Sequence, residues 1–187
     1  MAFRISYSTP LPVSNNFGLY AQTEQGNAIT GIVPQDLIGN GVGVLTIPAK
    51  RFVKGDSFLA EFSGYLSAQN NEILRIIIYT TTPLGNIILA DTLDQTMPNV
   101  VNDVWNLILT FTIREIGGVG VASIVSSGEF HYSKSSNNTQ RGFGFITTNN
   151  TTFDTEVDNN LKVVAYWGSN DPINIIQTET FILNKIY

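Results

Sequence analysis

Residues 104–114 read Val-Trp-Asn-Leu-Ile-Leu-Thr-Phe-Thr-Ile-Arg, and this stretch decides the fold class. Large apolar side chains occupy every second position, namely Trp105, Leu107, Leu109, Phe111 and Ile113. Most positions between them are polar: Asn106, Thr110, Thr112 and Arg114. Successive side chains of a β-strand point to opposite faces of its sheet. The pattern therefore predicts a strand of an antiparallel sheet, with one face on the core and the other face wetter.

The same alternation recurs on both sides of this stretch. Residues 57–68 and 161–167 alternate in the same way, and in the last run we expect Ile175, Phe181 and Leu183 to share one face. Helical periodicity is nearly absent, so strands are expected from one end of the chain to the other. We expect them near residues 18–23, 28–33, 43–48, 57–68, 72–81, 86–92, 104–115, 119–133, 142–147, 161–168 and 175–186.

Turn-forming residues separate these predicted strands, as in Lys54-Gly55-Asp56 and Gln69-Asn70-Asn71. Gly and Asn tolerate the positive φ that tight turns need. Many short strands at regular spacing are typical of a β-sandwich, and their number fits a jelly roll. We therefore predict an all-β, two-sheet antiparallel β-sandwich of the jelly-roll type over residues 17–187. Residues 1–16, which include Pro10 and Pro12, are predicted to form an extended N-terminal arm.

The surface is predicted to carry little charge. Charged residues make up 13% of the 187-residue chain, about half the usual share, and the net charge is −5. The longest basic cluster, Lys50-Arg51 with Lys54, is small, so we expect no nucleic-acid binding. Residues 141–146, Arg-Gly-Phe-Gly-Phe-Ile, match the aromatic strand motif of RNA-recognition domains. Those domains also need two helices and a second aromatic strand, which the sequence does not offer.

Few residues of the chain could carry catalysis or bind a metal. There is no Cys, and His131 is the only His. A zinc site would therefore lack ligands, and a Ser-His-acid triad would lack identified partners. We expect no catalytic residue, no metal and no cofactor, and a protein that is not an enzyme. Asp154, Glu156 and Asp158 could offer oxygen ligands to calcium, but the glycine and register of a known calcium loop are missing, so we interpret them as solvated loop residues.

No targeting or membrane-spanning sequence is predicted. The N-terminus has no basic stretch followed by a long apolar run. No apolar run reaches the roughly 18 residues that a membrane helix needs. We therefore expect no membrane span, and a protein that stays in a cytosol or is packed there into something larger.

Three parts of the chain together carry a resemblance to a known family. They are residues 43–49 with 52–58 and 62–65, residues 105–107 with 111–117 and 128–132, and residues 160–168 with 180–187. In the rhythm of their strands and turns they resemble the trimeric tumour-necrosis-factor-like (TNF-like) jelly-roll proteins of large DNA viruses and phage fibre heads. The resemblance covers most of the chain, roughly from Asn15 to Tyr187, and includes no catalytic signature.

The resemblance implies a non-enzymatic structural or surface protein of a large DNA virus, acting as a homotrimer in assembly or attachment. Its location would be the virion or the host cytoplasm, and other virion proteins or host-surface glycans would be further partners. The subunits would pack around a threefold axis through the flat face of one sheet. Because aromatic residues are enriched at interfaces, we select four candidates for the trimer interface: Tyr65, Phe130, Tyr132 and Phe181.

Two alternatives remain open at this point. Jelly rolls often serve as lectins, and a carbohydrate-binding head would use exposed aromatic and amide side chains at a strand end. Its ligand-facing loop would contain Tyr166, Trp167, Asn170 and Asp171. The other alternative is a capsid vertex (penton) protein, which would form pentamers.

Overall fold

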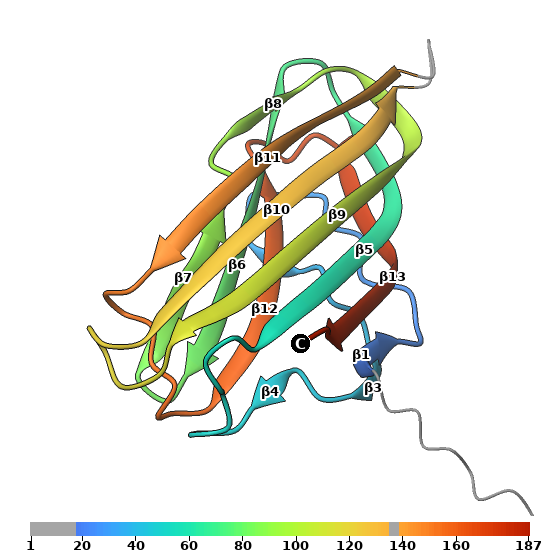
Figure 1. The fold of residues 1–187 in the computed structure, drawn as a ribbon. Helices are drawn as coiled ribbons and strands as arrows, with labels where there is room; N and C mark the ends of the chain where they lie inside the picture. Colours follow the sequence, from blue (N-terminus) through green and yellow to red (C-terminus); the bar gives the residue numbers. More distant parts are fainter. Residues whose placement is uncertain (1–17, 135–138) are drawn as a thin grey trace, which may run out of the picture.

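The alternating strands form two antiparallel sheets that lie face to face (Figure 1). This computed structural model describes residues 18–134 and 139–187. The predicted N-terminal arm, residues 1–16, lies outside the described residues. Every strand pairing within the described residues is antiparallel, and the prediction of an all-β sandwich of two antiparallel sheets is confirmed.

The larger sheet contains seven strands, in the order β11-β10-β9-β5-β13-β1-β3. Their bounds, in this order, are Thr139–Asn149, Ser123–Lys134, Val100–Glu115, Ser57–Ala68, Ile175–Lys185, Gly18–Gln22 and Gly41–Gly43. The alternating stretch that decides the fold class lies in β9, near the middle of this sheet. Figure 1 views the sheet from its outer side, with β11 to β13 running diagonally across the picture.

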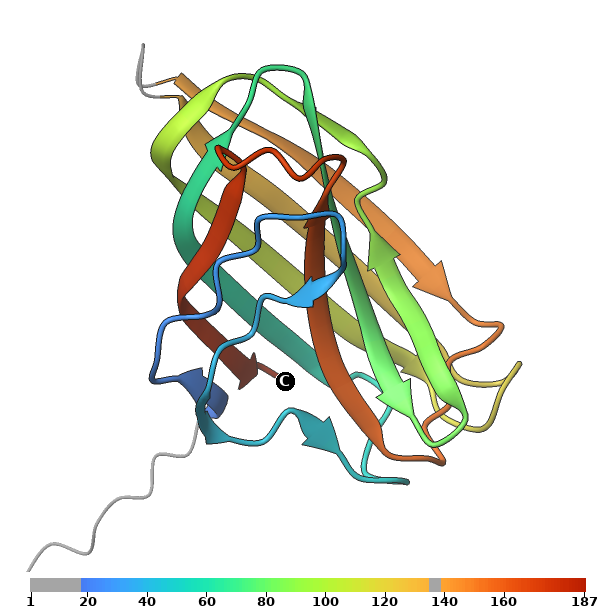
Figure 2. The same cartoon turned by 180° about the vertical axis from the view of Figure 1, so that it is seen from behind.

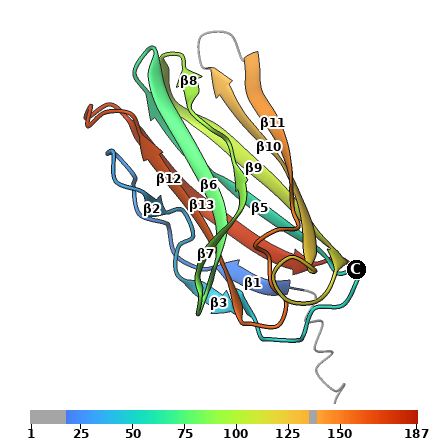
Figure 3. The same cartoon turned by 90° about the vertical axis from the view of Figure 1, so that its left-hand side faces the viewer.

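The smaller sheet contains six strands. Its main path is β2 (Gln35–Asp36), β12 (Asn159–Trp167), β6 (Glu72–Thr82) and β7 (Gly85–Asp91). The short strands β4 (Thr46–Ile47) and β8 (Gln95–Met97) pair with β12 and β6 respectively. The view from behind shows this sheet in front of the larger one (Figure 2), and the side view shows the two as separate layers (Figure 3).

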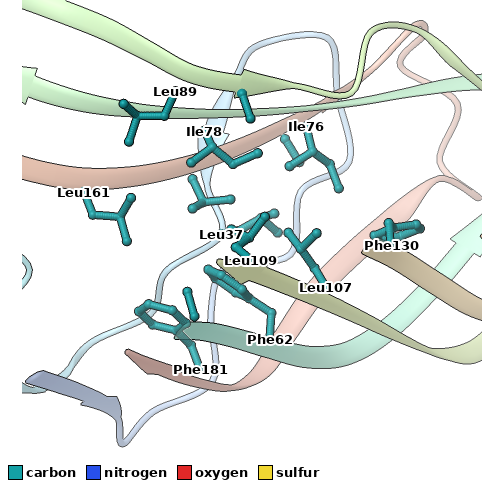
Figure 4. Packing of buried hydrophobic residues seen from close by; sticks show 14 of the residues in the cluster. Leu37, Phe62, Ile76, Ile78, Leu89, Leu107, Leu109, Phe130, Leu161 and Phe181 are labelled. Carbon is teal, nitrogen blue, oxygen red and sulfur yellow. The ribbon is translucent and has the colours of Figure 1, made fainter. Parts of the chain in front are cut away.

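The core fills the space between the two inner faces (Figure 4). Trp105, Leu107, Leu109, Phe111 and Ile113 are all buried, as the alternation in β9 predicts. Aromatic rings connect the strands of the larger sheet: the ring centroids of Phe62 and Phe181 lie 4.2 Å apart, and those of Phe130 and Phe143 lie 5.1 Å apart. Such stacked pairs stabilise a core beyond the apolar area that they bury.

Trp105 connects three strands of the larger sheet. Its Nε1–H donates to the carbonyl oxygens of Tyr65 in β5 and Gln177 in β13, each at 3.1 Å. Gly64 is the residue of β5 that pairs with Trp105. A Cβ atom at Gly64 would lie 1.9 Å from the carbonyl oxygen of Gln177. A glycine is therefore required where the backbones of β5 and β13 approach under the indole.

The structure corrects three predictions about strands. In β13 a bulge between Thr178 and Thr180 shifts the register, so Ile176, not Ile175, is buried with Phe181 and Leu183. Residues 28–33 do not form a strand, since Ile29 makes only an isolated bridge to Ile176. The predicted strand 43–48 is divided into β3 and β4, because Gly43 has φ +103° and ends the first of them.

An ion pair stabilises the outer side of the smaller sheet. Arg75 of β6 donates through Nε and Nη2 to the two carboxylate oxygens of Asp91 of β7, at 2.9 and 2.6 Å. Both side chains are less than one third exposed. These hydrogen bonds are the main cause that lowers the pKa of Asp91, and they raise the pKa of Arg75. A two-pronged contact of this kind fixes geometry as well as adding free energy.

We expect the Arg75–Asp91 pair to stabilise the fold at neutral pH and to stop doing so in acid. Because the folded-state pKa of Asp91 is lowered, its contribution is complete above the unfolded pKa of about 3.9 and is lost as the pH falls through the folded pKa. Asp91→Asn should therefore lower the free energy of unfolding by about 1 kcal/mol near neutral pH. Urea unfolding of both proteins, from about pH 7 to about pH 2.5, measures this difference, which should shrink at low pH.

Asp94→Asn is the matched control for this experiment. Asp94 is 3.5 Å from Arg75 and its side chain is 63% exposed, so its replacement should change the free energy of unfolding by less than about 0.5 kcal/mol. If Asp91→Asn lowers the free energy of unfolding by the same amount at neutral and at acid pH, the expected contribution of the Arg75–Asp91 ion pair is contradicted.

Candidate functional site

The seven-stranded sheet has an open outer face. In the side view, no described segment lies on the outer side of β11, β10, β9 and β5 (Figure 3). The residues that point outward from the five neighbouring strands β11 to β13 define what we call the outer face. It contains Leu59, Glu61, Ser63, Tyr65, Val104, Asn106, Ile108, Thr110, Thr112, Arg114, Val125, Ser127, Glu129, His131, Gly142, Gly144, Ile146, Thr148, Gln177, Thr180, Ile182 and Asn184.

Apolar side chains stand at the centre and on both sides of the outer face. Ile108 of β9 is in the middle and is 40% exposed. Ile146 of β11 and Ile182 of β13 are exposed two strands away on either side. Tyr65 and Val104, which pair across β5 and β9, add a second exposed apolar contact. An exposed apolar set on one flat sheet face is the kind of surface that marks an interaction site.

Hydroxyl groups on the outer face bond to one another across strands. Thr110 and Ser127 lie 2.6 Å apart, and so do the hydroxyls of Ser63 and Thr180. In each pair one hydroxyl donates a hydrogen bond to the other, so the two groups need fewer hydrogen bonds to water. Covering these groups with another surface therefore costs less than covering the same number of unpaired hydroxyls.

Charges on the outer face are few and flank its centre. Ile108 pairs with Glu129 on β10 and with Glu61 on β5. The Oε2 atom of Glu129 lies 3.1 Å from Nε2 of His131. The side chain of Glu129 is 69% exposed and that of His131 is 44% exposed. The centre of the face is thus an isoleucine between two carboxylates, one of which has a histidine beside it.

The outer face is hollowed rather than featureless. A hollow of about 540 Å³ extends over β9, β10 and β11, between Ile108 and Ile146. Its floor includes Gly144, where no side chain fills the space. A second hollow of about 280 Å³ lies on the other side of Ile108, between Asn106 and Ile182. Ile108 therefore forms a ridge between two depressions, and a partner with a complementary surface could pack against this shape.

The structure places the four predicted interface residues in two different environments. Tyr65 is 45% exposed and lies on the outer face. Phe130, Tyr132 and Phe181 are buried inside the sandwich, so their selection as interface residues is wrong. The reason is strand alternation: Phe130 and Tyr132 point inward from β10, where Phe130 stacks on Trp105 at 5.6 Å, and Phe181 stacks on Phe62.

The residues that sequence reasoning missed are aliphatic. Ile108 interrupts the polar side of the alternating stretch 104–114, and Ile146 and Ile182 do the same in β11 and β13. An apolar residue on the polar side of a strand is a signal for a covered or shared face. That signal was present in the sequence, whereas large aromatic residues more often fill a core.

The predicted ligand-facing loop is not assembled into one site. Trp167 is fully buried, and its Nε1–H donates to the carbonyl oxygen of Ile29 at 2.9 Å. Tyr166 points to the opposite side of β12. In the following loop, Asn170 accepts a hydrogen bond from the amide of Ile32, and Asp171 accepts one from the amide of Ile173. The prediction of a sugar platform with Trp167 is therefore wrong, because this ring has no exposed face.

The remaining candidate residues have local structural contacts. The carboxylate of Asp154 accepts a hydrogen bond from the amide of Glu156, and that of Asp158 accepts one from the amide of Ala49. The first contact fixes a local turn, and the second joins the loop before β12 to the segment after β4. Over residues 18–134 and 139–187, no three His, Cys, Asp or Glu side chains gather closely enough to hold a metal ion.

Within residues 18–134 and 139–187 there is no helix with the length and apolar character that crossing a membrane requires. The chain matches no protein-family model, and no curated protein is significantly similar to it in sequence. The resemblance to TNF-like jelly rolls therefore stays an expectation from the rhythm of strands and turns.

Proposed function

We propose that this protein is a non-enzymatic structural or attachment protein that acts as a homotrimer, with the outer face of the seven-stranded sheet as its subunit interface. A second copy of this chain is the occupant of that face. The observation that carries the proposal is the set of exposed apolar side chains, centred on Ile108, on the flat side of one sheet.

The size of the outer face supports this proposal. Five strands at about 4.8 Å spacing and about ten residues at about 3.4 Å rise cover roughly 20 by 35 Å, or about 700 Å². A standard stable interface buries about 800 Å² on each partner. The outer face alone therefore offers nearly the area that a lasting contact between copies needs.

The chemistry of the outer face supports a protein partner. Its hydroxyls are bonded in pairs, its apolar side chains are exposed, and Lys is absent from it. Interface centres are depleted in Lys and enriched in apolar residues. The chain as a whole has only 13% charged residues, and the charges that would be desolvated at the centre of the contact are those of Glu61 and Glu129.

The role in a virion follows from the resemblance to TNF-like proteins of large DNA viruses. In such an arrangement the threefold axis runs along the packed sheets, and loops at one end of the sandwich stay free. Those loops would contact other virion proteins or a host surface. The protein would then work by presenting a rigid assembled surface, in the virion or in the host cytoplasm where virions assemble.

Ile108→Lys should dissociate the trimer. The substitution replaces the apolar side chain at the centre of each subunit contact with a hydrated ammonium group. Glu61 and Glu129 lie beside it, but the cost of desolvating these charges on association exceeds their mutual attraction, which should weaken association by at least about a hundredfold. Sedimentation velocity at micromolar concentration measures this effect: the wild type should sediment as three subunits of 20.5 kDa each and the variant as one. Because Ile108 is partly exposed in the single chain, circular dichroism of the variant should be unchanged.

Ile88→Lys is the matched control. Ile88 is also an exposed isoleucine within a strand, but it belongs to β7 of the smaller sheet. This variant should remain trimeric. A wild-type protein that sediments as a monomer at micromolar concentration would overturn the proposal, and so would dissociation by Ile88→Lys but not by Ile108→Lys.

The same experiment decides between the trimer and the pentameric capsid-vertex alternative, since five subunits would support the latter. The carbohydrate-binding alternative has lost its main aromatic candidate, because Trp167 is buried. A glycan array probed with the assembled protein tests what remains of it.

A further inference from the structure

The edges of the two sheets differ in how far they are open to another strand. One edge of the larger sheet is β3 and one edge of the smaller sheet is β2, which are three and two residues long. The other edge of the smaller sheet is β7, whose register with β6 shifts between Ile78 and Tyr79. The fourth edge is β11, which has eleven residues and is the last strand on its side of the larger sheet (Figure 1).

Strand β11 lacks the features that usually protect a sheet edge. Proteins protect edges with very short strands, bulges, Lys or Pro. The pairing of β11 with β10 runs over the whole strand without a shift in register. Residues 139–149 contain no Lys and no Pro, and Arg141 is their only charged residue.

The backbone of β11 has free capacity on the side away from β10. In an antiparallel ladder, an edge strand directs about half of its N–H and C=O groups away from its neighbour. Among the described residues, no backbone hydrogen bond joins β11 to a segment other than β10. The edge is therefore a template on which another extended strand can pair.

The side chains of β11 complement a second copy of the same strand. Gly142, Gly144 and Ile146 point to the outer face, and Ile146 is 74% exposed. If two β11 strands lie antiparallel and centred on Gly144, Ile146 of each copy lies opposite Gly142 of the other, where no side chain competes for the space. On the other side of the sheet, Phe143 of each copy lies opposite Phe145 of the other. Aromatic pairs directly across two strands are stabilising.

This register is favoured over its neighbours. Centring the pair of strands on Phe143 or on Phe145 gives one aromatic pair, whereas centring it on Gly144 gives two. Centring on Phe143 would also put Arg141 opposite Phe145 of the other copy. The sequence of the strand thus selects a single way of pairing with itself.

We propose that β11 pairs with β11 of a second copy of this chain, antiparallel across a twofold axis, so that two seven-stranded sheets become one continuous sheet. Because the same edge is used on both copies, one contact uses up both edges and the association stops at a pair. The contact uses the edge of the sheet, whereas the trimer proposed above uses its outer face. The pairing therefore does not depend on the trimer, and where trimers form it would join one trimer to the next.

The pairing of two single edges is weak. It buries far less than the roughly 800 Å² per partner of a standard interface. We therefore expect single chains to pair near millimolar concentration and to stay apart at micromolar concentration. Such a contact suits an assembling particle, in which the local protein concentration is high.

A disulfide tests the register of the pairing. The chain has no Cys, and the nearest atom to a Cβ added at Gly144 is 3.6 Å away, so Gly144→Cys fits. In the proposed register residue 144 lies opposite itself, at about 4.5–5.5 Å between Cα atoms, a separation that a disulfide spans. In the Ile108→Lys background under mild oxidation, Gly144→Cys should form dimers at least about tenfold faster than the matched control Thr148→Cys, which lies opposite residue 140 of the other copy.

Sedimentation equilibrium of Ile108→Lys up to about 1 mM measures the pairing without thiols. Adding Ile146→Lys should weaken the dimer at least about tenfold, since a lysine on a strand edge opposes pairing. Adding Ile88→Lys, on the edge strand β7, should leave the dimer unchanged. The proposal is overturned if Ile108→Lys stays a monomer at about 1 mM, or if the two cysteine variants form dimers equally fast. Since every protein in these tests carries Ile108→Lys, a failure of the trimer proposal would not affect the result.

Discussion

Replacing Trp105 by Ala is expected to lower the free energy of unfolding by about 4 kcal/mol. Removing a fully buried tryptophan loses its transfer free energy and leaves a cavity, which together cost about 3–5 kcal/mol. The hydrogen bonds from Nε1 to Tyr65 and Gln177 are lost as well. Urea unfolding measured by circular dichroism gives the difference. To keep subunit association out of the result, both proteins should carry Ile108→Lys.

Trp105→Phe separates packing from hydrogen bonding at this position. It keeps a ring against Phe130 but removes the Nε1–H donor, so it should cost about 2 kcal/mol, roughly half as much. A loss below about 1.5 kcal/mol for Trp105→Ala would mean that the residue does not connect β9, β5 and β13 as described, since a buried Trp cannot be truncated so cheaply.

Gly64→Ala is the second substitution with a large expected effect, about 3 kcal/mol or more. The new Cβ would lie 1.9 Å from the carbonyl oxygen of Gln177, and backbone cannot be moved aside by a change of rotamer. The strands β5 and β13 must therefore separate at the site where Trp105 bonds to both. Overpacking of this kind costs about 1–3 kcal/mol when side chains can adjust, and more when they cannot.

Gly144→Ala is the control for steric conflict in a strand. Gly144 belongs to β11 of the same sheet, but the nearest atom to its added Cβ lies 3.6 Å away, which is ordinary contact. In the Ile108→Lys background this variant should unfold within about 0.5 kcal/mol of its parent, as expected for an open surface site. Equal losses for Gly64→Ala and Gly144→Ala in urea unfolding would argue against the close approach of β5 and β13.

Strand alternation made much of the fold predictable. Strand β5 was expected at residues 57–68 and has these bounds, and the inward set from Trp105 to Ile113 in β9 is buried as expected. Both strands lie within the larger sheet with a core on one side and an open face on the other. In that setting the period of two runs without interruption over residues 57–66 and 104–113, so the sequence pattern and the structure coincide there.

The prediction of strands from sequence failed in two situations. In one, an extra residue breaks the two-residue period of a strand. In the other, a short segment becomes a strand only because a neighbouring strand pairs with it. The bulge at Glu179 reverses which residues of β13 point inward, and no residue type marks it in advance. The short strands β2 and β8 exist only because β12 and β6 offer them an edge. Ile32 and Val33 look like strand residues but are exposed next to Pro34.

The candidate site was less predictable than the fold. Aromatic residues were chosen for the subunit contact, but Phe130, Tyr132 and Phe181 are buried, and only Tyr65 is on the outer face. Whether an aromatic ring fills a core or lies on a surface depends on which face of its strand the core occupies. Ile108 could have been predicted as an interface residue from the sequence, because it lies between Asn106 and Thr110 on the mostly polar side of this strand.

The position of β13 in the larger sheet determines when the sandwich can complete its folding. The segment Ile175–Lys185 is the last of the described strands to be synthesised, yet it lies between β5 and β1 in the larger sheet and bonds to both. Until it has been synthesised, β5 has an unpaired edge and Phe62 lacks its stacking partner Phe181. Sheets whose paired strands are far apart in the sequence fold slowly, and their strand edges stay unpaired and exposed until the partner strand is added. Completion of the sandwich therefore has to wait until residues 175–185 have been synthesised, and a chain that stops before residue 175 is left with a sheet divided in two.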